Sequence, residues 1–366
     1  MHASSVPRVV TATAVDSPRP PAGVGEQRSR RGRRAKIAVG IGIGMALAVV
    51  VVAAVAVVER PSTTAIALPV IGQARNLFNA DIGDPYVLPV AATSRSPGGY
   101  WVFGTNDWPA HVPTAFSPDL IHWQPGPDAM PTLPAWAGPD PTGSLTWAPA
   151  VLATGRGYLR SVSVPDPMSG RECIAAEASR APEGPYNEAG TGPLGCQRYL
   201  GGSIDPTIVR DGGHRLHLLW KNDGNCCGLV VSLWEQDLSP DGLRVVGPPH
   251  RLLSADQGWE GGVIERPVVI PAKHGGWWLF HAGNNWDRAA YATGVAFCPT
   301  LTGPCRDAKQ VPFLSTLGSQ YSPGGLDAFT DLHGVRWVVY AIWNRPSRNG
   351  RFYCCRSVEL ARLVSS

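Results

Sequence analysis

A short pattern repeats along the chain and restricts the folds that it can adopt. Each copy is an apolar run, then a turn that contains glycine, then a strand rich in aromatic residues. The copies begin near residues 84, 148, 205, 265 and 327, a spacing of about 60 residues. Repeats of this length, with no long helical pattern between them, are typical of the blades of a β-propeller. We therefore predict an all-β fold, a five-bladed β-propeller.

Composition and charge agree with this fold. The chain has 42 Gly and 35 Pro but only 16% charged residues, which suits short strands joined by tight turns. The first 36 residues hold eight Lys or Arg and two Asp or Glu, which leaves 24 basic and 26 acidic residues in the rest. Because nucleic-acid binding needs clustered basic residues on the folded part, we expect no nucleic-acid partner.

The amino-terminal part predicts a membrane anchor. Residues 1–36 are rich in Pro, Ser and Arg and read as a disordered basic cytoplasmic tail. Residues 37–58 are 22 uncharged residues, long enough for a transmembrane signal-anchor helix. The basic flank should stay in the cytoplasm, so the bulk of the chain lies outside.

This reading sets the domain boundaries and leaves one alternative. After the anchor we expect a stalk at residues 59–79 and a five-bladed propeller domain at residues 80–366. The alternative is a signal peptide that is cleaved near Ala67, after the sequence AIA, which would release the protein from the membrane.

Eight cysteines follow the apolar segment, an even number that favours disulfides in an oxidising compartment. We expect Cys298 to pair with Cys305 across a short turn, and Cys173 to pair with Cys196. The adjacent pairs remain ambiguous, because they can bridge each other or form vicinal rings: Cys226 with Cys227, and Cys354 with Cys355. The cysteine spacing does not resemble a zinc site, so we predict no metal ligands.

Acidic residues stand beside proline where three of the repeats begin. They are Asp84, Asp205 and Glu265. In a propeller the innermost strands begin around a shared opening, so acids at the same place in each repeat should meet there. Proline is tolerated at the first position of a strand. Because like charges repel when they are buried together, we predict that these acids form a catalytic site.

Six segments, in order, carry a resemblance to a known family. They are FSPDLIHWQPGPDAMPTLPAWAG, TWAPAVL, SIDPTIV, LWKNDGN, WEGGVIERP and YATGVAFCPTLTGPC. With the acid-proline pairs, they resemble the five-bladed propeller glycosidases of glycoside hydrolase family 43. That family includes arabinofuranosidases, arabinanases and xylosidases. The resemblance covers nearly all of residues 80–366, and it implies hydrolysis of α-arabinofuranosyl or β-xylosyl linkages in a polysaccharide or oligosaccharide.

The resemblance also implies roles for the acids. Asp84 corresponds to the general base, Asp205 to the acid that modulates pKa values, and Glu265 to the general acid of an inverting mechanism. Inversion needs about 6.5–9.5 Å between the acid and the base, against about 5–5.5 Å for retention. We expect an ionised Asp205 to raise the pKa of Glu265.

Two departures from the family pattern bear on the site. Arg266 stands where the family usually has a small residue, and we expect it to narrow the pocket or to pair with Glu265. The segment SPGGLDAF lacks the histidine that many members carry near a central ion. We therefore expect no cofactor, with a structural calcium as the disfavoured alternative. Glu260 is a second acid near Glu265, but we rank it below Glu265.

The expected substrate-binding residues are aromatic platforms and one cation: Trp147, Trp259, Trp286 and Arg266. We expect a monomer. Two rival functions stay open: a propeller that binds wall glycans without catalysis, if Arg266 keeps Glu265 ionised, and a retaining hydrolase of the invertase kind. The distance between Asp84 and Glu265 separates retention from inversion.

Overall fold

The computed structural model describes residues 67–78, 81–93, 98–107, 109–139, 145–345, 348–352 and 356–364. These residues belong to one compact unit, Thr63–Ser366. The predicted tail, the membrane segment at 37–58, and Cys354 with Cys355 lie outside the described residues. Within the described ranges, no helix has the length and apolar character needed to span a membrane.

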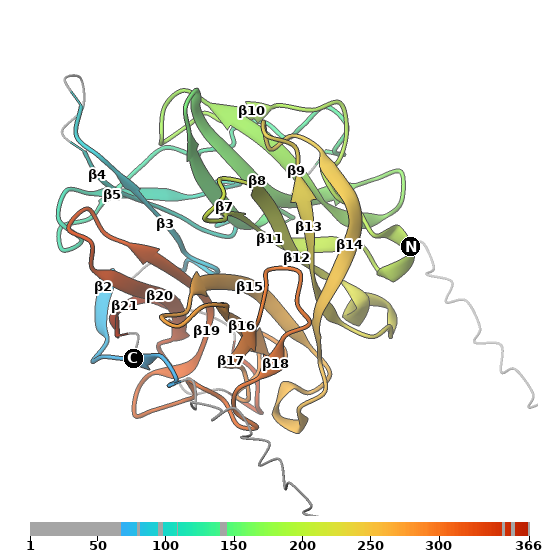
Figure 1. Ribbon diagram of the computed structural model, residues 1–366. Coiled ribbons are helices and arrows are strands. Elements are labelled where there is room, and N and C mark those ends of the chain that lie inside the picture. Colours follow the sequence, from blue (N-terminus) through green and yellow to red (C-terminus); the bar gives the residue numbers. More distant parts are fainter. Residues whose placement is uncertain are drawn as a thin grey trace, which may run out of the picture. The chain divides into compact units, whose positions relative to one another are not determined.

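The described strands form five antiparallel sheets that follow one another around a ring (Figure 1). Blade 1 consists of β3 (Tyr86–Val90), β4 (Gly99–Phe103), β5 (Thr114–Ser117) and β6 (Gln124–Pro125). Blade 2 consists of β7 (Trp147–Thr154), β8 (Gly157–Asp166), β9 (Arg171–Ser179) and β10 (Asn187–Glu188). The expectation of an all-β, five-bladed propeller is confirmed.

The next two blades repeat the same order of strands from the inside outward. Blade 3 consists of β11 (Ser203–Arg210), β12 (Leu216–Asn222), β13 (Ser232–Leu238) and β14 (Val245–Ser254). Blade 4 consists of β15 (Ile264–Pro271), β16 (Trp277–Gly283), β17 (Ala292–Cys298) and β18 (Arg306–Asp307). Three short 3₁₀ helices lie in the connections: η1 (Arg198–Leu200), η2 (Gly224–Cys227) and η3 (Gly258–Glu260).

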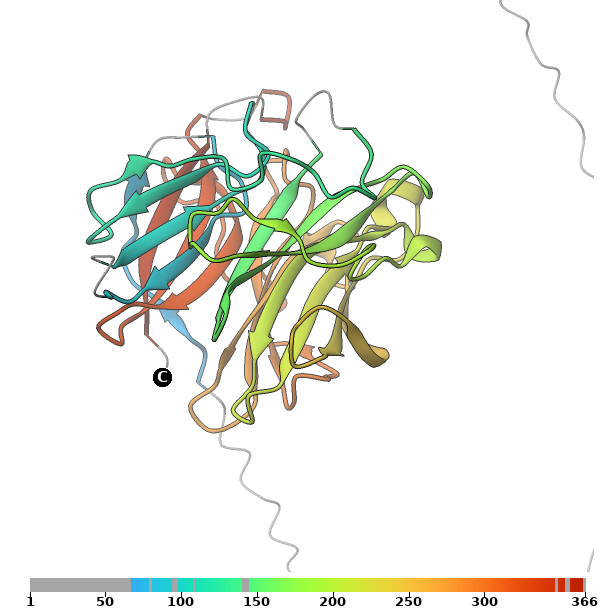
Figure 2. The same cartoon turned by 90° about the horizontal axis from the view of Figure 1, so that it is seen from above.

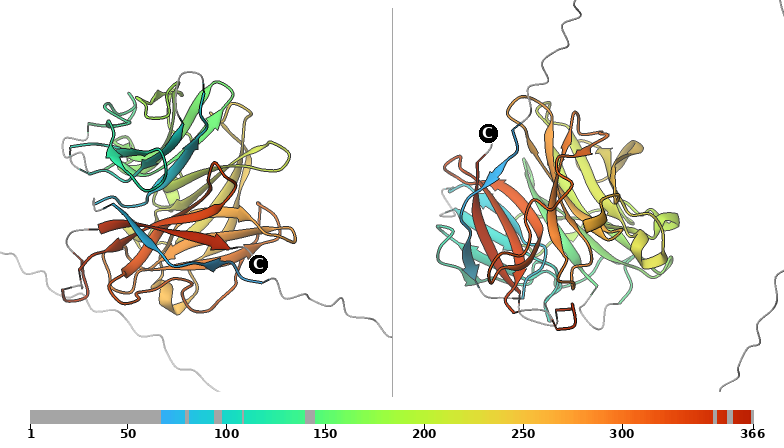
Figure 3. Two further views of the ribbon diagram at one scale, coloured as in Figure 1. Left: turned by 90° about the vertical axis from the view of Figure 1, so that its left-hand side faces the viewer. Right: turned by 90° about the horizontal axis from the view of Figure 1, so that it is seen from below.

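Blade 5 joins the two ends of the described chain. It contains β19 (Tyr321–Thr330), β20 (Arg336–Trp343), β21 (Arg356–Val364) and two amino-terminal strands, β1 (Val70–Ile71) and β2 (Arg75–Phe78). Both amino-terminal strands pair with β21, and Figure 3 shows these blue strands beside the red carboxy-terminal strands. The described part of the predicted stalk at residues 59–79 thus contributes two strands to blade 5.

The innermost strands close the ring. Strands β3, β7, β11, β15 and β19 each lie against the next, and β19 lies against β3 (Figure 2). Each blade packs on two neighbours, so its middle strands are buried on both faces; all seven residues of β12 are buried. This explains the apolar run LHLLW in a strand that does not alternate.

The hydrophobic core is divided among the gaps between neighbouring blades. Leu88 and Phe103 meet Val151 and Val162 between blades 1 and 2, and Ile174 meets Leu218 between blades 2 and 3. The remaining gaps are filled in the same way by apolar side chains of the facing blades. The fold therefore buries its apolar surface between repeats and keeps the centre of the ring for polar groups.

Three disulfides join described cysteines. Cys173 pairs with Cys196, and Cys298 pairs with Cys305, as predicted. Cys226 and Cys227 form a vicinal disulfide within η2, which resolves one of the two ambiguous pairs.

Candidate active site

One pocket of about 480 Å³ lies where the innermost strands begin. All five blades contribute to its wall. The lining includes Gly83, Asp84, Thr105 and Asn106 from blade 1, Trp147 from blade 2, Ile204, Asp205, Lys221, Asp223 and Asn225 from blade 3, Glu265, Trp286 and Tyr291 from blade 4, and Ser322, Gly324, Gly325, Trp343 and Arg356 from blade 5. The three acids predicted from the repeats thus share one cavity.

The backbone at the start of each innermost strand shows why these residues meet. In every blade, a non-glycine residue with a left-handed backbone precedes a proline: Asp84 (φ 48°), Ala148 (50°), Asp205 (56°), Arg266 (55°) and Ser322 (51°). Proline cannot donate to the ladder, and in blades 2 to 5 the strand register shifts at this step. Strained positions of this kind often occur at functional sites.

This alignment corrects two expectations from the sequence. Glu265 lies one residue before the strained step, level with Trp147 and Ile204, so the three acids do not all occupy one repeat position. Blade 5 begins at Ser322-Pro323, not at Leu326-Asp327, because β19 starts at Tyr321. Glu265 lines the pocket nonetheless.

Asp84 is held in place from two sides. The hydroxyl of Thr105 donates to Asp84 Oδ2 at 2.6 Å and accepts from the backbone N–H of Ala148 at 3.0 Å. On the other side, a Cβ at Gly325 would lie 2.6 Å from Asp84 Oδ1, and Gly325 itself has φ +62°. Only glycine fits there without displacing the carboxylate.

We expect Thr105→Val to destabilise the fold. Valine keeps the shape of the side chain but leaves the buried N–H of Ala148 without its acceptor, which should cost about 1–3 kcal/mol of unfolding free energy. Urea denaturation measures the change. Thr105→Ser keeps the hydroxyl and should stay within about 1 kcal/mol of the wild type; equal losses in both variants would assign the effect to packing instead.

Asp205 is buried at the floor of the pocket, with 7% of its surface exposed. Its backbone N–H donates to the hydroxyl of Ser163, and Asp205 Oδ2 accepts from the backbone N–H of Arg266 at 3.1 Å. Burial, followed by the charge of Glu265, raises the pKa of Asp205 to about 7. Both Asp205 and Glu265 line the pocket.

A pH dependence of stability follows from two buried acids. Burial raises the pKa of Asp327 to about 6, and that carboxyl accepts from the backbone N–H of Val87 in blade 1. The unfolded chain has ordinary aspartate pKa values near 3.8. Between about pH 4 and pH 7 the folded state thus binds more protons than the unfolded state, so these two groups make stability fall as the pH rises.

The substitution Asp205→Asn should remove the part of the pH dependence of stability that Asp205 causes. We expect the wild type to lose unfolding free energy relative to the variant as the pH rises from about 4 to about 7. Urea denaturation of both proteins across that range measures the difference. A difference that does not change with pH would contradict the raised pKa of Asp205.

Two donors hold the carboxyl group of Glu265. Lys221 Nζ lies 3.1 Å from Glu265 Oε2, and the hydroxyl of Tyr291 donates to Glu265 Oε1 at 2.9 Å. Lys221 is 1% exposed and also lies 3.7 Å from Asp223. Burial lowers the pKa of Lys221, but the charges of Glu265, Asp205 and Asp223 outweigh burial and raise it. The lysine therefore stays charged among these acids.

Lys221, Tyr291 and Thr105 were not predicted from the sequence. One feature of the sequence could have indicated Lys221. It is a charged residue in the strand LHLLWKN, whose residues are otherwise mostly apolar. A charge in such a strand normally needs a buried partner. Tyr291 begins the segment YATGVAFCPTLTGPC, but nothing in the letters marks it or Thr105 as a partner of an acid, so only the fold shows their contacts.

The predicted aromatic residues separate into two groups. Trp147 and Trp286 line the pocket, and Trp286 stacks on Trp343 with ring centroids 5.9 Å apart. Trp259 does not line the pocket; it stacks on His281 inside blade 4. The prediction that Trp259 binds substrate is therefore not supported by its position.

Arg266 does not narrow the pocket or pair with Glu265. Its buried guanidinium reaches from blade 4 to the carbonyl oxygens of Asp84, Ala148 and Pro149 in blades 1 and 2, at 3.3–3.5 Å. The cation that contacts Glu265 is Lys221 instead. Because a guanidinium already fills the space between these carbonyl groups, the residues present do not fit a central calcium.

Comparisons with known proteins identify the class. Residues 81–364 match the sequence profile of Glycosyl hydrolases family 43. A thermostable family-43 glycoside hydrolase is similar in structure (TM-score 0.65, 23% identity), with 82% of this chain and 91% of that chain covered. An endo-arabinase from Bacteroides thetaiotaomicron is also similar in structure (TM-score 0.60, 17% identity), with 77% of this chain and 94% of that chain covered. So is an α-L-arabinofuranosidase from Lactobacillus brevis (TM-score 0.61, 17% identity), with 78% of this chain and 91% of that chain covered.

At these identities, the structural similarities show the fold alone, and no curated protein sequence matches the chain. The profile match extends over most of the chain. The protein is thus a glycosidase, an enzyme that hydrolyses O-glycosyl bonds, and it belongs to glycoside hydrolase family 43. The resemblance noted in the sequence is confirmed.

Proposed function

We propose that the enzyme hydrolyses α-arabinofuranosyl or β-xylosyl linkages in a polysaccharide or oligosaccharide, with inversion of the anomeric configuration. Glu265 is the general acid, Asp84 the general base, and Asp205 the group that modulates pKa values. The observation that carries the proposal is that these three carboxyl groups, from three blades, line one pocket. The similar arabinan- and arabinofuranoside-degrading enzymes support the substrate class.

The two groups proposed to transfer protons come from different blades. Asp84 is in blade 1 and Glu265 is in blade 4, and blade 5 separates these two blades in the ring. Asp84 takes a proton from water as the water oxygen bonds to the anomeric carbon. The bond from that carbon to the leaving oxygen breaks at the same time, and Glu265 gives its proton to that oxygen.

Asp205 acts through Glu265. The two acids come from adjacent blades, and the charge of Glu265 contributes to the raised pKa of Asp205. We propose that the carboxyl group of Asp205 acts on Glu265 through the electrostatic repulsion between the two groups. Lys221 and Tyr291 keep the Glu265 carboxyl in position.

Aromatic side chains supply the sugar-binding surface. Trp147 lies on one part of the wall, and Trp286 stacks on Trp343 on another. Trp286 is 54% exposed, so its ring is open to a sugar face. Such rings offer large apolar contact at a low entropic cost.

A substrate panel tests the proposal. The full chain should release nitrophenol from 4-nitrophenyl α-L-arabinofuranoside or 4-nitrophenyl β-D-xylopyranoside, and should leave the β-D-glucopyranoside intact. Product analysis on arabinan and xylan then identifies the linkage. Failure to hydrolyse any pentoside, or activity on the glucoside alone, would contradict the proposal.

Arg266 makes no ion pair with Glu265 in this structure, but Lys221 does. Binding of a glycan without hydrolysis in the substrate panel would favour the non-catalytic alternative.

We further propose that residues 37–58 anchor the enzyme, with the propeller outside the cytoplasm, and that it acts as a monomer. Three disulfides support an oxidising compartment. The alternative is secretion after cleavage near Ala67. Recovery of the protein in alkali-washed membranes would support the anchor, whereas a soluble form that begins near residue 68 would support cleavage.

A further inference from the structure

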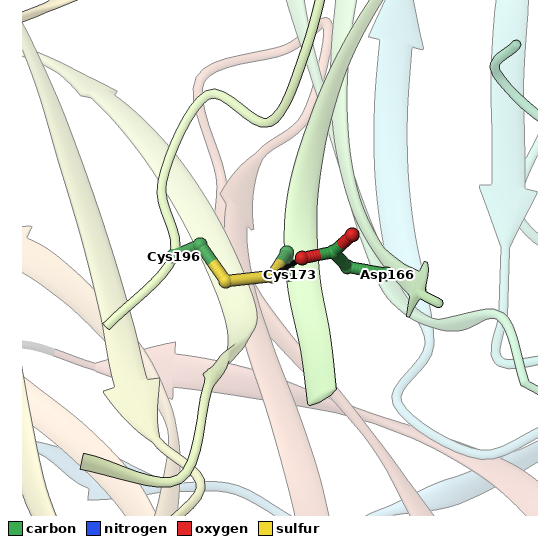
Figure 4. A group of neighbouring side chains, drawn as sticks. All are labelled: Asp166, Cys173 and Cys196. Atoms are coloured by element: carbon green, nitrogen blue, oxygen red, sulfur yellow. Dashed lines mark hydrogen bonds between the residues drawn. A yellow bond between two sulfur atoms is a disulfide. The ribbon is translucent and has the colours of Figure 1, made fainter. Parts of the chain in front are cut away.

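Three groups of side chains in the described part of the chain bring potential metal ligands together away from the pocket. The first is Asp166 with Cys173 and Cys196. Figure 4 shows that the two sulfur atoms are joined in a disulfide beside the carboxyl group of Asp166. A disulfide sulfur is not a thiolate ligand, and Asp166 already forms an ion pair with Arg198. This group is closed to a metal.

The second group is His217 with Glu235 and Asp237 in blade 3. His217 Nδ1 lies 2.8 Å from Glu235 and 3.0 Å from Asp237, and its Nε2 lies 3.4 Å from Asp211. The hydrogen bond to Glu235, against the effect of burial, raises the pKa of His217. Carboxylates face both ring nitrogens, and a protonated imidazole would balance their charge without a metal. Within the residues that the structure describes, Nε2 has no hydrogen-bond partner, but Nδ1 is hydrogen-bonded to Glu235 and is not free to orient a metal ligand.

The third group is Glu260, His281 and Asp307 in blade 4, and it is different. The side chains of Glu260 and His281 are fully buried, and that of Asp307 is 9% exposed. Among the described residues, Glu260 Oε1 and His281 Nε2 have no hydrogen-bond partner. Nε2 lies 3.4 Å from Asp307 Oδ1 and 4.0 Å from Glu260 Oε1. Unpartnered buried polar atoms therefore converge on one point.

Hydrogen bonds fix the remaining atoms of Glu260 and His281. Glu260 Oε2 accepts from the backbone N–H groups of Asp256 and Gln257, both at 2.9 Å, in the capping turn of η3. His281 Nδ1 lies 3.2 Å from the carbonyl oxygen of Ala282. A carbonyl can only accept, so Nδ1 carries a hydrogen. In the neutral ring the lone pair is then on Nε2, the nitrogen that faces the two carboxylates. Outer hydrogen bonds of this kind orient metal ligands.

The packing around His281 keeps the ring in this orientation. Trp259 stacks on the imidazole with centroids 5.9 Å apart. A Cβ at Gly294 would lie 2.5 Å from Nε2, so glycine leaves the space that the ring occupies. A lone pair and two carboxylate oxygens without a donor between them repel one another, and a cation between them would remove the repulsion.

We propose that Glu260, His281 and Asp307 bind a divalent transition-metal ion of the zinc type. Zinc takes imidazole nitrogen and carboxylate oxygen at about 2.0–2.2 Å, which places two tetrahedral ligands about 3.4 Å apart. The distance from His281 to Asp307 matches, and Glu260 must approach by about half an ångström. Calcium and magnesium take oxygen ligands and should bind weakly here.

The proposed ion has a structural role and does not depend on the proposed substrate. It would fasten the η3 turn, which leads directly into β15 and Glu265, to β16 and β18 of the same blade. Because the ion would bind the folded state alone, zinc should raise the Tm of the metal-stripped full chain. At 100 times the Kd, the rise should be about 5 °C.

Isothermal titration with Zn²⁺ tests the site. The stripped wild type should bind one ion per chain saturably, and Asp307→Asn should weaken binding at least about 10-fold. Asp307→Asn is nearly isosteric and the least buried of the three changes; Glu260→Gln provides a second variant. Asp237→Asn, in the His217 group, is the matched control and should bind zinc like the wild type.

X-ray absorption of the zinc-loaded protein should show nitrogen and oxygen neighbours at about 2.0–2.2 Å. The absence of saturable binding would overturn the proposal and leave a protonated His281 as the explanation of the group. Binding that is unchanged in both Asp307→Asn and Glu260→Gln would also overturn it, because the zinc would then lie elsewhere.

Discussion

Asp84→Asn is expected to lower kcat by about 10²–10⁴-fold, the range for loss of a general base. Asparagine keeps the shape of the side chain and can still accept from Thr105 through its carbonyl oxygen, so the pocket should keep its form. What it loses is the capacity to take a proton from water. Steady-state rates on the best nitrophenyl pentoside measure the change.

The interpretation requires that the fold is intact. The Tm of Asp84→Asn should therefore lie within a few degrees of that of the wild type. Glu183→Gln serves as the control, since Glu183 is a carboxylate of blade 2 that does not line the pocket, and it should keep wild-type kcat. Turnover close to the wild type in Asp84→Asn would remove Asp84 from the mechanism.

Glu265→Gln is expected to have an effect that depends on the leaving group. A general acid matters most when the leaving oxygen is basic, because that oxygen must be protonated as the bond breaks. On arabino- or xylo-oligosaccharides we expect kcat/KM to fall about 10²–10⁴-fold. On a dinitrophenyl glycoside, whose leaving group needs no proton, the loss should be less than about 10-fold.

This contrast separates acid catalysis from a structural role. Glu265 also neutralises Lys221, so its replacement leaves a buried cation without one partner and can disturb the pocket generally. A general disturbance would lower the rates on both substrates alike. Equal losses on the two substrates would therefore contradict the role of Glu265 as the acid.

The number of blades can be predicted from the sequence because a similar short pattern, an apolar run followed by a glycine turn and an aromatic-rich strand, recurs in each blade. In every repeat a proline stands near the start of the innermost strand. Because this feature involves only neighbouring residues, it can be recognised in the sequence. In blade 5 the letters mislead, since Leu326-Asp327 resembles the other repeat starts, whereas the strained step is at Ser322-Pro323. The backbone φ angle at Ser322 identifies the start of blade 5, and the sequence does not specify that angle.

Contacts between blades were harder to predict. Arg266 follows Glu265 in sequence, yet a left-handed backbone at Arg266 directs its side chain toward blades 1 and 2, away from Glu265. Lys221, from the second strand of blade 3, takes the place beside Glu265 that we had expected for Arg266. Such pairings depend on how repeats 40 or more residues apart pack, and the sequence pattern carries little information about that packing.

In the proposed mechanism, carboxyl groups from different parts of the ring carry out a single displacement. Proton NMR of the first sugar released by the wild type, recorded before mutarotation, tests this step. The anomer opposite in configuration to the substrate should appear first. Initial release of the anomer with the configuration of the substrate would contradict inversion, and with it the assignment of Asp84 as a base that activates water.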